Sequence, residues 1–197
     1  MRKEDLNPDP LIQFKLWFEE AVASGIILPE AMALATVTKD GKPAVRMILQ
    51  KGIEHGGVVF FTNYNSPKAK QLSENPYAEA VFFWDRLQRQ VRIEGRVEKI
   101  SEEESDQYWR TRPRDSQIAG SVSNQSQILE SREVLEKKFE DIKKRVGEGE
   151  IPRPKFWGGY CLMPEKIEFW QGMPNRMHDR FLYIKKGDQW QIVRLAP

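Results

Sequence analysis

With 197 residues, 40% of them hydrophobic and 30% charged, the chain is long enough for one globular domain that needs no metal or disulfide support. Its formal net charge of +2 is too small to argue for a polyanionic partner. No apolar run has the length of a membrane span or the form of a signal peptide, and the single cysteine cannot form an internal disulfide, so we expect a cytoplasmic protein.

The first predicted element is a helix that begins at Asp9-Pro10, with the aspartate as N-cap and the proline in the first turn. Its expected buried residues recur at helical spacing and are Leu11, Phe14, Phe18, Ala21 and Val22. Strands over 31–38 and 44–50 flank a turn at Asp40-Gly41, which is a hairpin pattern. A further strand over 58–62 follows the Gly56-Gly57 turn.

The middle of the chain continues with a short helix after Ser66-Pro67 and two strands, over 77–84 and 89–100. The second strand alternates between an apolar face (Val91, Ile93, Val97) and a charged face (Arg92, Glu94, Arg96, Glu98). A strand with one solvated face is typical of an antiparallel sheet or barrel.

Helices dominate the next stretch. Ser101 and Glu104 form a capping box for a helix through Arg110, and a longer helix over 131–146 carries an apolar stripe of Leu135, Phe139, Ile142 and Val146. Strands over 159–163 and 166–171 and a hairpin over 180–195 close the chain. We expect an α+β, mainly antiparallel barrel in one domain, 1–197, with a helical segment at 1–30, a helical insertion at 101–150 and C-terminal strands at 156–197.

Three segments concentrate groups that can bind ligands. Arg46 to Lys51 places cations at both ends of one strand, Tyr108 to Ser116 gathers a phenol, guanidinium groups and a hydroxyl, and Ile167 to Arg180 brings Trp170, Arg176 and His178 together. Arginine and hydroxyl donors suit a phosphate dianion. Each segment also has a simpler interpretation, as solvated strand ends, a basic helix terminus and an ordinary histidine.

Other kinds of site are disfavoured. Two histidines and one cysteine, far apart in sequence, predict no metal site. There is also no GxGxxG or GxxxxGK[ST] motif, so neither a dinucleotide fold nor a P-loop is predicted.

Five motifs in the same order make the chain, from about Asp9 to Pro197, similar to the pyridoxine (pyridoxamine) 5′-phosphate oxidase family. They are Arg112 to Ile118, Phe156 to Tyr160, Glu168 to Gly172, Arg176 to Arg180 and Arg194 to Pro197. The resemblance implies an FMN-binding split barrel that forms a homodimer with FMN between the subunits. It implies oxidation of pyridoxine and pyridoxamine 5′-phosphates by O₂ to pyridoxal 5′-phosphate and H₂O₂, with no nucleic-acid or membrane partner.

The resemblance also implies which residues bind each ligand. The FMN contacts would be Arg46, Met47, Ile48, Leu49, Gln50, Lys51, Phe61, Thr62, Lys68, Gln90, Gln125, Ser126, Trp170 and Arg180. The substrate contacts would be Lys51, Tyr108, Arg112 and Ser116 at the phosphate, with Arg176 and His178 at the pyridine ring as the catalytic pair. Pro67 departs from the family, which usually has an arginine before the lysine, so we expect one fewer contact with the FMN phosphate. The family's N-terminal Arg-x-x-Tyr-like lid is also not expected, because Arg2 to Leu6 does not supply it.

Two alternatives stay open at this point. A split-barrel flavin reductase would have the same fold, but this function would not explain the Arg112 to Ser116 and Arg176 to Arg180 segments, which match the substrate side of the oxidase family. A non-catalytic binder, of pyridoxal phosphate, a flavin or nucleic acid, is compatible with interleaved aromatic and basic residues, although the low net charge counts against nucleic acid.

Overall fold

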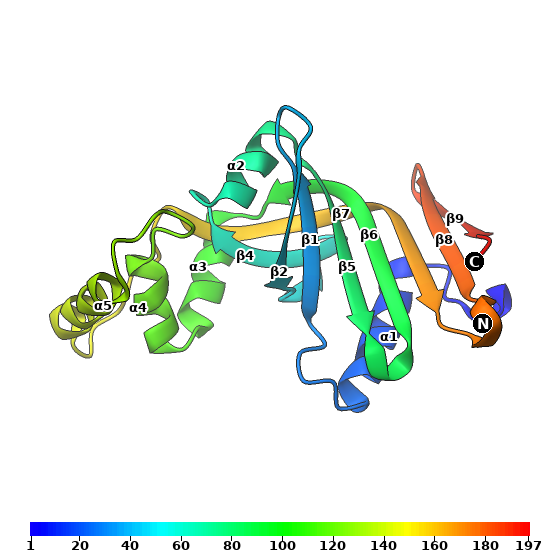
Figure 1. Cartoon of the computed structure of the whole chain (residues 1–197), viewed down its shortest axis with the longest axis horizontal. Coiled ribbons are helices and arrows are strands. Elements are labelled where there is room, and N and C mark those ends of the chain that lie inside the picture. Colours follow the sequence, from blue (N-terminus) through cyan, green and yellow to red (C-terminus); the bar gives the residue numbers. More distant parts are fainter.

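A single antiparallel sheet of nine strands organises the protein, and the computed structural model describes all residues, 1–197 (Figure 1). The strands are β1 (Ala31–Val37), β2 (Pro43–Leu49), β3 (Gly52–Glu54), β4 (Gly57–Asn63), β5 (Tyr77–Trp84), β6 (Arg89–Lys99), β7 (Trp157–Gln171), β8 (Asp179–Lys186) and β9 (Gln189–Arg194). The helices are α1 (Pro10–Ala23), α2 (Pro67–Glu74), α3 (Glu102–Thr111), α4 (Arg114–Val122) and α5 (Arg132–Val146), with short 3-10 turns at Lys3–Asp5, Asp85–Leu87 and Pro174–Arg176.

Local sequence signals place most of these elements correctly. The Asp9 carboxylate accepts hydrogen bonds from the amides of Leu11 and Ile12, which confirms the predicted helix start. Ser101 and Glu104 form the reciprocal capping box of α3. The hairpins β1–β2 and β8–β9 are also confirmed.

The prediction of two separate strands near the C-terminus was wrong, because β7 is one strand of 15 residues. It pairs with β6 along its length, while its other edge pairs first with β4 and then with β8. Pro164 does not end the strand: Gly95 of β6 pairs with Pro164 and Glu94 with Lys166, so Glu165 is an extra residue that forms a bulge in β7. The sheet therefore splits along β7, whose two halves serve two different neighbours.

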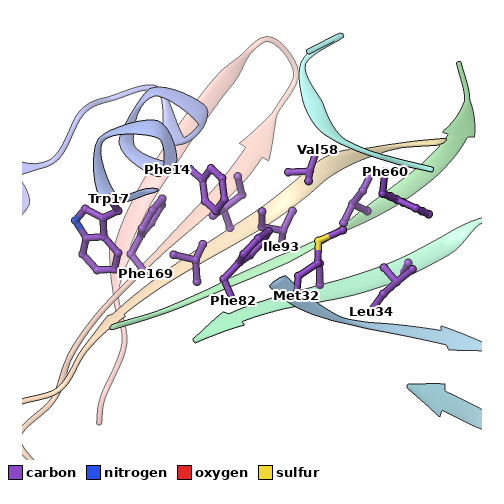
Figure 2. Close-up of a cluster of buried hydrophobic side chains, with 14 of the residues drawn as sticks. Phe14, Trp17, Met32, Leu34, Val58, Phe60, Phe82, Ile93 and Phe169 are labelled. Atoms are coloured by element: carbon purple, nitrogen blue, oxygen red, sulfur yellow. The ribbon is translucent and has the colours of Figure 1, made fainter. Parts of the chain in front are cut away.

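The main core lies between α1 and the inner face of the sheet (Figure 2). Phe14 packs edge-on against Phe82 with ring centroids 4.9 Å apart, and Trp17 packs on Phe169 at 5.1 Å. The buried face of α1 was predicted only in part, because Trp17 is buried and Val22 is 52% exposed. This core holds the strands that carry the site at fixed positions.

Helices α3, α4 and α5 gather at the opposite end of the sheet from α1 (Figure 1). A second small core of Trp109, Ile118, Ile151 and Trp157 lies there. The sequence did not predict α4, since Pro113 was interpreted as following a helix end, whereas it is the N-cap residue of a new helix. The predicted stripe of α5 faces this core but is only half-buried, and no residue of α5 is buried.

Two smaller observations complete the fold. The short strand β3, which the sequence did not predict, extends the sheet beside β4. No helix combines the length and apolar character that crossing a membrane requires.

Candidate active site

A cleft of about 1000 Å³ opens between β2, β4 and the helices α2, α3 and α4. Four cationic side chains line it, and no carboxylate does: the cations are Arg46, Lys51, Lys68 and Arg112. None of the four takes part in an ion pair. Positive charge that the chain itself leaves unneutralised favours the binding of an anion.

Lys68, in the first turn of α2, is the most buried of these cations, with 8% of its surface exposed. Its ammonium donates to Thr62 Oγ1 at 3.0 Å, Ser66 Oγ at 3.3 Å and Gln125 Oε1 at 2.9 Å, all neutral acceptors. Burial, together with the nearby charge of Arg46, lowers the pKa of Lys68 to about 8.

Arg46 reaches the same end of the cleft from β2. Its guanidinium donates to the carbonyl of Leu34 at 2.9 Å, to Thr36 Oγ1 at 2.6 Å and to Gln71 Oε1 at 3.1 Å. Burial lowers the pKa of Arg46, and again no carboxylate offsets its charge. Arg46 and Lys68 form the first of two anion-binding groups, which we call the first cradle.

The second cradle comprises Lys51, Tyr108, Arg112 and Ser116, which come from β2–β3, α3 and α4. Burial lowers the pKa of Arg112, and its Nη1 is buried without a hydrogen-bond partner. Burial raises the pKa of Tyr108 despite the opposing charge of Arg112, so the phenol stays protonated at neutral pH and remains a donor. An unpaired buried donor beside a protonated phenol suits the oxygens of a phosphate.

Stacked aromatic rings also line the cleft. The ring of Phe61, on β4, stacks on Tyr108 with centroids 3.8 Å apart and an interplanar angle of 11°. Across the cleft, Gln125 accepts a hydrogen bond from Lys68, and Ser126 next to it has a positive φ of 67°. A non-glycine residue in this left-handed conformation is locally strained, a feature that is common in binding loops.

Most of the residues predicted from the sequence meet in this cleft. Those that line it are Arg46, Met47, Ile48, Leu49, Lys51, Phe61, Thr62, Lys68, Tyr108, Arg112, Ser116, Gln125 and Ser126. Gln50 does not, because its side chain is buried away from the cleft, where its Oε1 has no hydrogen-bond partner.

The other predicted residues lie elsewhere on the same sheet. Gln90, Trp170 and Arg180 are direct neighbours across β6, β7 and β8 and form a row. Arg180 pairs there with Glu168 at 2.7 Å, which raises the pKa of Arg180.

The loop after β7 brings His178 to this row, with its ring centroid 4.7 Å from that of Trp170. His178 Nδ1 accepts a hydrogen bond from the amide of Met173 at 3.1 Å, so the proton of the neutral ring is on Nε2. Asn175 and Arg176 both have positive φ, 57° and 62°, which makes this loop strained. We call Gln90, Trp170, Arg176, His178 and Arg180 the distal row.

The cleft and the distal row lie at opposite ends of β7. Trp157, which opens the strand, lines the cleft, whereas Trp170 lies next to its last residue. A strand of 15 residues spans on the order of 45 Å if straight. A single chain therefore does not bring the two groups to one small ligand.

Several residues that line the cleft were not predicted as site residues, among them Asn63, Thr111, Gly120, Ser123 and Trp157. Gly120 and Ser123 were missed because α4 was not expected. Trp157 belongs to the Phe156 to Tyr160 motif, which had been noted without a role.

The residues of the cleft fit FMN and a phosphorylated substrate. FMN carries one phosphate dianion and a planar ring system, and the cleft offers two unneutralised cationic cradles together with the stacked rings of Phe61 and Tyr108. The first cradle, with hydroxyl and amide groups beside its two cations, has the donors that a phosphate requires.

Comparisons with protein families agree with this geometry. Residues 18–145 match the family described as pyridoxamine 5′-phosphate oxidase, and residues 157–197 match the pyridoxine 5′-phosphate oxidase C-terminal dimerisation region. The chain is 51% identical to the pyridoxine/pyridoxamine 5′-phosphate oxidase of Gloeothece citriformis, with all of this chain and 92% of the relative covered. It is 54% identical to that of Nostoc punctiforme, over 98% of this chain and 90% of the relative.

Solved structures give the same fold. PhzG of Burkholderia lata 383, in complex with tetrahydrophenazine-1-carboxylic acid, superposes with a TM-score of 0.94 at 31% identity, over 98% of this chain and 95% of PhzG. An FMN-binding protein of Nostoc punctiforme, related to pyridoxamine 5′-phosphate oxidase, superposes with a TM-score of 0.77 at 19% identity, over 98% of this chain and 99% of that one. The expected split barrel is thereby confirmed.

Proposed function

Because the chain belongs to the pyridoxine/pyridoxamine 5′-phosphate oxidase family, we propose that the cleft between β2, β4 and the helices α2 to α4 is its active site. The reaction is the FMN-dependent oxidation of pyridoxine 5′-phosphate and pyridoxamine 5′-phosphate to pyridoxal 5′-phosphate. This function replaces both alternatives that the sequence left open, the flavin reductase and the non-catalytic binder.

One observation carries the placement of the site: four cations line the cleft, and no carboxylate neutralises them. We assign the first cradle, Arg46 and Lys68, to the phosphate of FMN, with Gln125 and Ser126 beside it. The second cradle is then left for the phosphate of the substrate. With one phosphate in each cradle, the two flat ring systems would lie in the space between the cradles.

The chain's own contribution to the reaction is mainly positional. When bound, FMN supplies the electron-accepting chemistry, and O₂ takes the electrons on with release of H₂O₂. Arg112, Lys51, Tyr108 and Ser116 anchor the substrate at its phosphate, whose arm is attached to the ring carbon next to the one that bears the oxidised C4′ atom. Such orientation contributes up to about 7–11 kcal/mol to lowering a barrier in the best cases.

As a member of this family the chain forms a homodimer. We propose that the distal row of one subunit completes the cleft of the other, with FMN at the subunit interface. The outer face of the sheet supports this arrangement, since Val45, Met47 and Phe83 are 69%, 66% and 56% exposed on β2 and β5. Phe83 is the direct neighbour of Gln90 in the distal row, so this apolar surface continues into the row.

Within that arrangement His178 and Arg176 contact the pyridine ring. His178 accepts from the Met173 amide through Nδ1, and its Nε2 therefore faces a ligand as a donor. Arg176, which is exposed and forms no ion pair, is free to orient the C4′ substituent.

The absorption spectrum of the purified protein tests the function directly. Protein mixed with FMN and desalted should retain a flavin band, and anaerobic addition of pyridoxine 5′-phosphate should bleach it, with recovery when air is admitted. Protein that stays colourless after desalting would refute the cofactor assignment. A retained band that does not bleach with either phosphorylated substrate would refute the reaction.

A further inference from the structure

Trp157 is the common neighbour of Phe61, Tyr108, Trp109 and Arg112 beside the second cradle. It is 7% exposed at the start of β7. Its indole stacks on Phe61 at 5.3 Å and 11°, and lies edge-on to Trp109 at 4.7 Å. The guanidinium carbon of Arg112 lies 4.7 Å from the centre of the same indole.

Arg112 is held by aromatic rings and by no carboxylate. Its guanidinium also lies 4.9 Å from the ring of Trp109, so two indoles contact it. A guanidinium bound through its π face keeps its N–H edges available for a ligand. The buried Nη1 of Arg112 makes no hydrogen bond within the chain.

The two glycines after Trp157 allow this packing. A Cβ on Gly158 would collide with the Tyr64 hydroxyl, and one on Gly159 would collide with the side chains of Ile100 and Phe61. The amide of Gly159 also donates to Ser105 Oγ, on α3, at 3.1 Å. The start of β7 therefore fixes α3, which carries Tyr108 and leads into Arg112, against β4.

We propose that Trp157 is a positioning residue that, with Trp109, orients the Arg112 guanidinium toward the substrate phosphate and thereby determines the preference for phosphorylated over unphosphorylated ligands. This inference rests on the proposed role of the second cradle. It gives the Phe156 to Tyr160 motif a role outside the two cradles, because Trp157 acts through its packing against Arg112.

The test is the ratio of two dissociation constants, those of pyridoxal and pyridoxal 5′-phosphate, measured by calorimetry on the FMN-loaded protein. The ratio isolates the contribution of the phosphate, since both ligands share the ring. Trp157→Leu should lower the ratio about tenfold, the order expected for a desolvated cation–π contact. Trp157→Phe, which keeps a ring against Arg112, should restore part of it.

A double-mutant cycle separates positioning from general damage. In an Arg112→Ala background, Trp157→Leu should leave the ratio unchanged. Equal weakening of both ligands, or the same drop in the Arg112→Ala background, would overturn the proposal. If Arg112→Ala itself leaves the ratio at its original value, the assignment of the second cradle is wrong and the inference falls with it.

Gly120 provides a second variant if Trp157→Leu does not fold. A Cβ there would lie 3.0 Å from Arg112 Nη1 and 3.0 Å from the Trp109 ring. Alanine is otherwise favourable within a helix. Gly120→Ala should therefore reduce the ratio severalfold with no loss of thermal stability, and an unchanged ratio would count against the proposed clamp.

Discussion

Lys68 is a buried cation whose hydrogen-bond partners are all neutral, which makes FMN binding sensitive to pH. Its pKa of about 8 in the FMN-free protein means that the ammonium loses its proton above that pH, whereas a bound phosphate favours the charged form. The dissociation constant of FMN should therefore rise between pH 8 and 9.5, by up to about tenfold per pH unit. Flavin fluorescence titrations at several pH values measure this.

Two lysine variants serve as controls for that titration. Lys68→Met should weaken FMN binding at pH 7 and flatten the pH profile. Lys70→Met, on the exposed side of the same helix, should change neither. The stability of the FMN-free protein should change in the opposite direction from its FMN affinity. Between pH 8 and about 10.5 the unfolded chain binds a proton at Lys68 that the folded chain does not, so the free energy of unfolding should rise with pH. A pH-independent FMN affinity in the wild type would contradict this role for Lys68.

Arg46 and Arg112 should separate the two ligands from each other. Arg112→Ala should raise KM for pyridoxine 5′-phosphate by one to two orders of magnitude, in line with about 1.5–3 kcal/mol for a hydrogen bond to a charged group, and barely alter FMN retention. Arg46→Ala should release FMN, with little effect on KM once FMN is in excess. Steady-state kinetics and flavin content after desalting measure the two effects. Equal losses of both ligands in both variants would refute the division into two cradles.

Single residues were predictable from the sequence where their chemistry is conspicuous. Arg46, Lys68 and Arg112 carry charge in unusual local settings, and the resemblance to a family gave each a ligand. Trp157 and Gly120 had no such signal, because packing an indole against a guanidinium or leaving room for it depends on contacts between distant segments. The Nδ1 bond of His178 depends in the same way on the fold of its loop.

Helix α2 presents its first turn to the cleft, with Pro67 at a position that lines it. The resemblance to the family implies an arginine at this position. Pro67→Arg should therefore add a phosphate contact and tighten FMN binding severalfold to tenfold. Repulsion between the new arginine and the cations Arg46 and Lys68 reduces this gain in affinity. Fluorescence titration of FMN compares this variant with Pro67→Ala, which alters the helix start without adding charge. An equal effect of arginine and alanine would show that the cation itself has no role.

Helix α3 holds the second cradle and depends on its N-terminal cap. Ser101 Oγ accepts from the amide of Glu104, and Glu104 pairs with His55 at 2.7 Å, which ties the helix to the turn between β3 and β4. Ser101→Ala should lower the free energy of unfolding by about 1 kcal/mol, the usual cost of losing such a cap. Urea denaturation measures it, with Ser73→Ala in α2, a residue with no cap role, as the matched control. A change below the error of the control would mean that packing alone holds α3.

Helices and strands were predictable where a capping residue or a turn sequence marks their boundary. Asp9-Pro10, Ser101 with Glu104, and Asp40-Gly41 each mark a boundary through their own backbone chemistry, and the corresponding elements were correct. The continuous β7 and the extra helix α4 were missed because both contain or follow a proline that usually interrupts regular structure. Pairing with β6 carries β7 past Pro164, and Pro113 starts a helix where one had just ended.

At the scale of the whole molecule, the predicted site residues lie in two groups, the cleft and the distal row, at the two ends of β7. The resemblance implied the residues of both groups and a site between subunits, but not which residues lie at which end of β7, since strand pairing and curvature decide where the ends of a long strand lie. In the homodimer proposed above, in which the outer sheet faces meet, one subunit's distal row would lie at the other's cleft. The same surfaces meet twice under two-fold symmetry, so two equivalent composite sites result.

Complementation between two inactive subunits tests that composite site. Lys51 belongs to the cleft and Arg176 to the distal row, and both are exposed, so a charge reversal at either should leave the fold intact. Lys51→Glu and Arg176→Glu should each reduce the activity of the homodimer strongly. Coexpressed with two different affinity tags, they form a heterodimer in which one site carries both substitutions and the other carries neither. That heterodimer should recover about half of the wild-type activity. If both residues served the same subunit's site, each site of the heterodimer would carry one substitution, and its activity would stay at the average of the two inactive parents.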